Sequence, residues 1–72
     1  MNVYRIEIMA LPADEGGGYA AWVPDLPGCM SDGDTPDQAR QNVELAIQEW
    51  IEEAERQGTP IPAPTKIAAS AY

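Results

Sequence analysis

The chain has 72 residues, with 12 acidic and 4 basic side chains, and its formal net charge is −8. A chain of this length buries only roughly 60% of its unfolded surface, so the sequence predicts one small domain with a thin core, and no apolar run approaches the roughly 20 residues that span a bilayer. The negative charge argues against direct binding of nucleic acid or anionic membranes and favours a basic protein partner, although it could also serve solubility alone.

Residues 2–11 are predicted to form the first strand, because apolar side chains alternate along them. Tyr4, Ile6 and Ile8 share the face expected to meet the core, and Met9 lies on the other face. Residues 12–18 begin with proline and end with three glycines, so they cannot extend the strand and are expected to form a flexible hairpin connection.

Residues 19–23 are predicted to form the second strand, which carries an aromatic side chain on each face, Tyr19 on one and Trp22 on the other. Pro27 and Gly28 are the residue types that the centre of a type II turn requires. After this rigid reversal, residues 29–32 are predicted to pair as a short third strand.

Residues 36–57 are predicted to form one long helix. Thr35 offers an N-cap hydroxyl, Pro36 occupies the first helical position, and Gln38 holds the reciprocal position of a capping box. Gly58 supplies the stop. Seven apolar residues recur at steps of three and four and form a stripe expected to cover the sheet: Ala39, Val43, Ala46, Ile47, Trp50, Ile51 and Ala54.

Residues 60–69 are predicted to leave the helix as an extended tail that adds a fourth strand at the sheet edge. The first half of this segment is too rich in proline for an interior strand. The last three residues are expected to fray.

Three motifs together resemble the HicB antitoxin family. The first is residues 18–29, with the run Pro24-Asp25-Leu26-Pro27-Gly28-Cys29. The second is Gly33-Asp34-Thr35-Pro36 at the helix start, and the third is residues 58–64 with Ile61-Pro62-Ala63-Pro64. Their order and spacing match the family over nearly the whole chain, which is more specific than any one motif.

The resemblance implies an α+β, partial RNase H-like fold: a three-stranded antiparallel meander, one long helix on one face, and a C-terminal edge strand. It also implies a function, since family members bind and occlude a small basic HicA-type toxin, an enzyme that cleaves mRNA in the cytoplasm. Many members carry a further DNA-binding domain. No such domain is recognised after Pro64, so direct DNA binding is not expected.

A catalytic role is not expected. Two-metal nuclease chemistry needs several convergent carboxylates, and only Glu7 lies in the interior of a predicted strand. Without histidine there is no Cys/His set for zinc and no imidazole base for Cys29, which is therefore predicted to be a packed structural thiol. No cofactor or metal is predicted, and a single cysteine suits a reducing cytoplasmic compartment.

The predicted partner-binding residues are acidic side chains in loops together with apolar side chains near them: Asp14, Glu15, Tyr19, Trp22, Asp25 and Leu26. If the helix covers the Tyr19 face, Trp22 projects from the opposite face beside Val3 and Met9, where an apolar patch would mark a partner site. Trp50 is expected to be a core residue. Leu45 lies opposite the stripe, either as an ordinary exposed leucine or in a dimer contact.

The alternative function is an orphan module without a toxin partner. Its sheet edge or outer face would assemble homodimers or higher oligomers with a structural or small-ligand-binding role. Retention of a small basic protein at low salt, lost at high salt, would favour the antitoxin, and a homo-oligomer indifferent to such proteins would favour the orphan.

Overall fold

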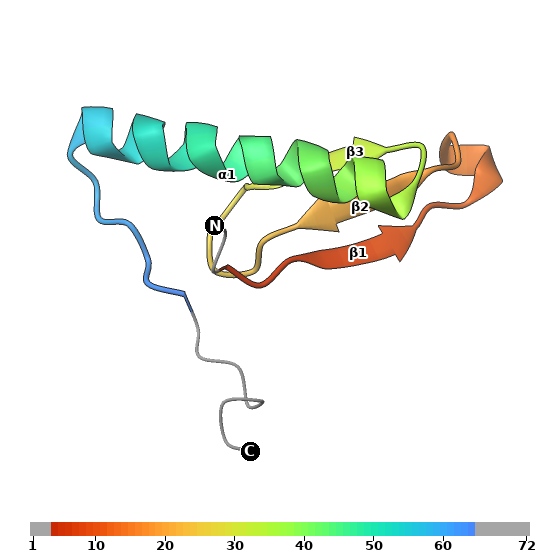
Figure 1. Ribbon diagram of the computed structural model, residues 1–72, viewed down its shortest axis with the longest axis horizontal. Coiled ribbons are helices and arrows are strands. Elements are labelled where there is room, and N and C mark those ends of the chain that lie inside the picture. The colour runs from red at the N-terminus through yellow and green to blue at the C-terminus, as the bar shows by residue number, and fades with distance from the viewer. Residues whose placement is uncertain (1–3, 65–72) are drawn as a thin grey trace, which may run out of the picture.

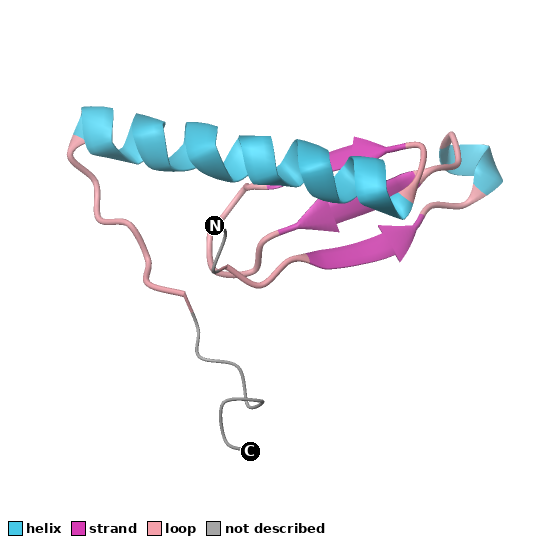
Figure 2. Cartoon of the chain, in the orientation of Figure 1, coloured by secondary structure: helices cyan, strands magenta, loops and turns pink. Residues whose placement is uncertain are grey.

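The computed structural model describes residues 4–64 and is a two-layer α+β domain (Figure 1). Strands β1 (Glu7–Ala10), β2 (Tyr19–Trp22) and β3 (Met30–Gly33) form an antiparallel sheet in the order β1-β2-β3. A 3-10 turn, Ala13–Glu15, lies in the first connection. Helix α1 (Pro36–Gln57) lies across one face of the sheet and extends beyond it toward its C-terminal end (Figures 1 and 2). The predicted α+β class, meander and single covering helix are confirmed.

Both ends of α1 are fixed by local hydrogen bonds. The Thr35 hydroxyl accepts the backbone N–H of Gln38 at 3.1 Å, and the Gln38 side chain accepts the N–H of Asp34 at 3.0 Å. Gly58 ends the helix in the left-handed conformation, with φ of 72°. The N–H of the next residue, Thr59, bonds to the carbonyl of Ala54 at 2.9 Å. The predicted bounds, 36–57, therefore agree with the structure, and only the donor to Gln38 differs from an ideal capping box.

The core lies between α1 and one face of the sheet. Part of the predicted helix stripe is buried in this core, and β2 with the following turn contributes the other buried side chains. The buried cluster comprises Ala21, Val23, Leu26, Cys29, Ala39, Val43 and Ile47. Leu26 and Val43 are the largest side chains that are completely buried. Tyr4 and Ile6 pack against this cluster as predicted, whereas Ile8, the third residue of the predicted inward face, is 38% exposed.

The first strand is shorter than predicted, because residues 4–6 make no ladder with β2. Residues 2 and 3 of the predicted strand lie outside the described residues, and residue 11 follows the end of β1. The second strand ends at Trp22, one residue before its predicted end. The third strand is displaced by one residue, to Met30–Gly33. Residues 59–64 form no strand. The rest of the predicted edge strand, 65–69, lies outside the described residues, so the fourth strand and the RNase H-like relation stay predictions.

The exit segment after α1 runs back toward the start of the chain. The Tyr4 hydroxyl donates to the carbonyl of Pro62 at 2.6 Å. Ile61 and Pro62 are half-buried. The described part of this segment is therefore tied to the start of the chain by the bond from Tyr4. Within residues 4–64, no helix is long and apolar enough to cross a bilayer.

Candidate functional site

A tight loop, residues 23–29 and here called the signature turn, joins β2 to β3. The N–H of Leu26 bonds to the carbonyl of Val23 at 3.1 Å, and the N–H of Cys29 bonds to the carbonyl of Leu26 at 3.0 Å. Gly28 has φ of 80°, the value that a type II turn requires after proline. The predicted turn is therefore present, and it is preceded by a second reversal that points Leu26 inward.

Leu26 is completely buried in the core. Its side chain stabilises the loop from inside and has no surface to offer a partner. The sequence expectation of an apolar partner contact from Leu26 is corrected by this placement, and the residue is left out of the contact surface considered below.

The sheet has one face that α1 does not cover, here called the outer face. The strand register places Trp22 between Glu7 of β1 and Met30 of β3, and it places Ala20 between Met9 and Asp32. The outer face thus comprises Glu7, Met9, Ala20, Trp22, Met30 and Asp32. Its two methionines are 51% and 65% exposed. The centre is apolar, and carboxylates stand at its edges.

Tyr19 and Trp22 lie on opposite faces of the sheet. Tyr19 is half-buried and packs against the core on the helix side, whereas Trp22 is half-buried on the outer face. The sequence left the role of Trp22 open, and its place among the exposed methionines matches the apolar patch considered there.

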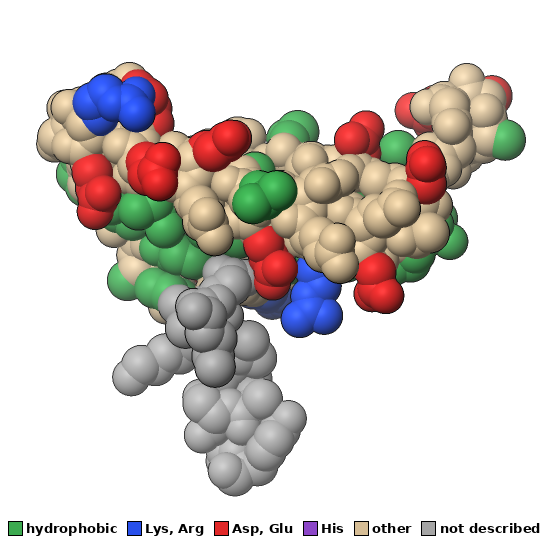
Figure 3. All heavy atoms as spheres, turned by 45° about the horizontal axis from the view of Figure 1, so that its top comes forward, with side chains coloured by type: hydrophobic (Ala, Val, Ile, Leu, Met, Phe, Trp, Pro, Cys, Tyr) green, Lys and Arg blue, Asp and Glu red, His purple; other side chains and the backbone are tan. Residues whose placement is uncertain are grey.

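The predicted acidic residues do not form one cluster. Asp14 and Glu15 are exposed in the turn before β2, and Asp25 is half-buried in the signature turn after it. The length of β2 separates them, so they stand at opposite ends of the outer face. Further carboxylates spread along the exposed side of α1 (Figure 3).

The described residues offer no metal centre, since no group of three or more His, Cys, Asp or Glu among residues 4–64 could hold an ion.

Cys29 is buried at the end of the signature turn, with 4% of its surface exposed. Burial raises the pKa of the Cys29 thiol, because the thiolate would lose its hydration. This agrees with the predicted packed thiol.

Cys29 is expected to react with iodoacetamide at pH 8 at least about tenfold more slowly in the folded chain than in urea. The thiolate is the nucleophile, and burial in the folded chain disfavours the thiolate. Above roughly pH 8.5 the unfolded state ionises first, so the free energy of unfolding should fall as pH rises. In a Cys29→Ala variant the free energy of unfolding should fall less over the same pH range, because no thiol ionises at position 29. Equal alkylation rates in the folded and unfolded states would contradict the burial of the thiol.

Trp50 lies on the predicted stripe but is only half-buried. It packs against the core, and its indole Nε1–H donates to the carbonyl of Pro27 in the signature turn at 2.9 Å. Leu45, on the opposite side of α1, is 58% exposed. The sequence predicted that Trp50 faces the core and that Leu45 lies opposite it, but it did not predict the pocket that Trp50 lines.

Comparison with known proteins matches residues 4–72 to the family described as "HicB_like antitoxin of bacterial toxin-antitoxin system". The chain is similar to UPF0150 protein ssr1765 of Synechocystis sp., with 38% identity over 61 residues, 85% of this chain and 76% of that protein. It is also similar to UPF0150 protein Ta0767 of Thermoplasma acidophilum, with 41% identity over 49 residues, 68% of this chain and 71% of that protein. These similarities cover most of the chain.

Proposed function

Because the chain belongs to the HicB-like antitoxin family of bacterial toxin-antitoxin systems, we propose that it neutralises a small basic HicA-type toxin that cleaves mRNA. It would do so by covering the toxin's active surface, without catalysis of its own. The cytoplasm, where mRNA is translated, is the proposed place of action.

The observation that carries this proposal is the outer face. Exposed apolar patches rimmed by polar groups mark protein contacts. Here Trp22 provides the apolar centre with Met9 and Met30 on the two flanking strands, while Asp14 and Glu15 lie beyond one end and Asp25 beyond the other. With a net charge of −8, the chain would attract a basic partner over long range, and the apolar centre would hold it after contact.

The test starts with the short basic reading frame, containing histidine, that is expected beside this gene. Its product should bind the purified chain, lose affinity as salt rises, and stop cleaving RNA when bound. Met30→Ser should weaken binding about tenfold, since it removes an exposed apolar contact beside Trp22 on the outer face. Calorimetry at fixed salt would measure the change.

Leu45→Ser provides the matched control, because Leu45 is about as exposed as Met30 but lies on the solvent side of α1. It should leave affinity unchanged. Equal losses in the two variants would contradict the outer face as the contact surface, and continued RNA cleavage in the complex would contradict the antitoxin role.

The orphan homo-oligomer remains the second candidate, and one feature favours it. Strands β1 and β3 are the two edges of the sheet formed by residues 4–64, and exposed strand edges can pair with another copy. Light scattering would distinguish the two functions: a homo-oligomer whose mass does not change when the basic protein is added would favour the orphan.

A further inference from the structure

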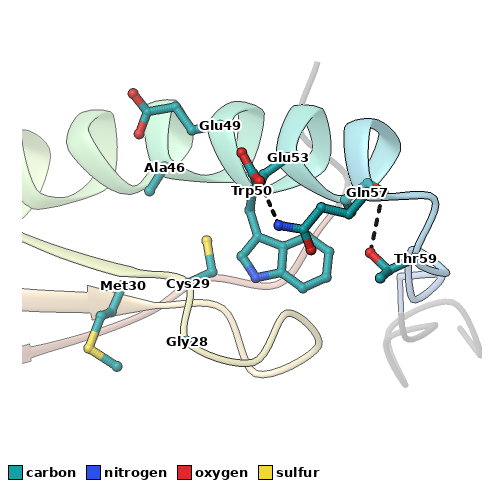
Figure 4. A pocket seen from close by; sticks show the side chains of 10 residues that line it. Gly28, Cys29, Met30, Ala46, Glu49, Trp50, Glu53, Gln57 and Thr59 are labelled. Carbon is teal, nitrogen blue, oxygen red and sulfur yellow. Dashed lines mark hydrogen bonds between the residues drawn. The ribbon is translucent and has the colours of Figure 1, made fainter.

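A pocket of about 520 Å³ lies between the C-terminal half of α1 and the end of the signature turn (Figure 4). Residues from three segments line it: Gly28, Cys29, Met30, Ala46, Glu49, Trp50, Glu53, Ala54, Gln57 and Thr59. Figure 4 shows the Trp50 indole beneath the helix, between the turn backbone and the side chains of Glu53 and Gln57. The pocket therefore combines an aromatic wall with acidic groups from one helix.

The indole is held in place. Its Nε1–H donates to the Pro27 carbonyl at 2.9 Å, which ties Trp50 to the turn that the two prolines make rigid. A fixed ring offers its face to a ligand at little entropic cost, because no rotamer has to be selected on binding. Tryptophan is also the aromatic residue that attracts cations most strongly.

The acidic groups of the lining are Glu49 and Glu53. Figure 4 shows the Glu53 carboxylate near the indole and the Glu49 carboxylate turned away from it, so Glu49 would reach a ligand at Trp50 only after its side chain rotates. Glu49 and Glu53 stand one turn apart on α1, and none of the described residues that line the pocket is Lys or Arg. Within residues 4–64, Glu49 makes no ion pair. Glu53 pairs with Arg56 through one carboxylate oxygen and accepts a hydrogen bond from the Gln57 side chain through the other at 2.6 Å. The Arg56 and Glu53 side chains are at least half exposed. Such a pair contributes at most about 1 kcal/mol, so a competing cation could replace it.

We propose that this pocket binds an arginine side chain of the basic protein partner, with the guanidinium stacked on Trp50 and paired with Glu49 and Glu53. This inference rests on the proposed function and adds a defined contact to it. Arginine fits better than lysine, because its planar guanidinium can stack on an indole and bond to carboxylates at the same time.

The pocket lies on the helix side of the sheet and meets the proposed contact surface at the edge strand β3. Met30 belongs both to the outer face and to the pocket lining. Figure 4 shows its side chain pointing away from α1. A partner seated on the outer face would therefore reach the pocket across Met30, past the signature turn that holds Asp25.

The probe is the blocked tripeptide acetyl-Gly-Arg-Gly-amide, titrated into the intact chain while the indole N–H resonance of Trp50 is followed by NMR. The expected result is a saturable shift with millimolar affinity. The double variant E49Q/E53Q should weaken binding about fivefold, since it removes both carboxylates. The matched control E52Q/E55Q removes the same charge from exposed positions outside the pocket and should change it little.

Equal weakening in the two double variants would overturn the pocket, because bulk charge would then explain the binding. So would a shift that never saturates. The lysine tripeptide should bind more weakly, and equal affinity would overturn the stacking on Trp50.

Binding of the toxin separates this inference from the proposed function. If the chain neutralises the toxin and both double variants bind it equally well, the pocket proposal fails while the antitoxin function stands. If the arginine peptide binds as expected but no toxin is bound, the pocket chemistry stands and the antitoxin function fails.

Discussion

Replacing Gly33 by alanine is expected to destabilise the domain by about 3 kcal/mol, more than most substitutions in the chain. A Cβ at this position would lie 2.5 Å from the backbone nitrogen of Ala39 and 2.7 Å from the carbonyl carbon of Gln38. Both are backbone atoms in the first turns of α1, so no side-chain rotation relieves the clash. Urea unfolding followed by circular dichroism would measure the loss.

Gly17→Ala is the control for this prediction. Gly17 has φ of 69°, but a Cβ there would meet nothing within 4 Å. Its replacement should cost only the penalty of a left-handed backbone, roughly 1–2 kcal/mol. If Gly33→Ala costs no more than Gly17→Ala, the close approach of β3 to α1 is not the reason for glycine at position 33.

The helix could be predicted to the residue because its limits are set by neighbours in the sequence. Thr35 and Gln38 satisfy the first free N–H groups, and Gly58 takes the left-handed conformation that ends the ladder. Each of these interactions spans at most five residues, so the sequence alone contains them.

The first strand could not be bounded in the same way. Alternation of apolar side chains reports which face a residue turns to the core, and Tyr4 and Ile6 do face it. The alternation does not predict where the neighbouring strand of the sheet ends, and that end decides where the ladder stops. The described ladder reaches from Ala10 to Glu7, because Glu7 is paired with Trp22, the last residue of β2.

In the candidate site, too, the features set by nearby residues could be predicted from the sequence, and those set by distant contacts could not. The opposite orientations of Tyr19 and Trp22 follow from the two-residue period of a strand and were predicted. The pocket beside Trp50 was not predicted, because it exists only where α1 extends beyond the sheet and meets the signature turn (Figure 1). No local pattern in the sequence encodes that meeting.

Leu26→Ala is expected to lower the free energy of unfolding by about 3 kcal/mol, because it removes a completely buried side chain and leaves a cavity. Leu45→Ala makes the same chemical change at a side chain that is 58% exposed and should cost well under 1 kcal/mol. Thermal unfolding of the two variants beside the parent chain would measure the difference.

The same pair of variants distinguishes a core residue from a contact residue. If Leu26 served a partner directly, Leu26→Ala would weaken toxin binding while leaving the free energy of unfolding unchanged. Because Leu26 is buried, we expect instead that Leu26→Ala lowers the free energy of unfolding first. The apparent affinity for the toxin should then fall only in proportion to the fraction of chain that is unfolded. Leu26→Met, which nearly conserves volume, should cost less than about 1.5 kcal/mol and keep the affinity of the parent. The exposed residues of the signature turn would then contact a partner, and Leu26 would keep them in position from inside the core.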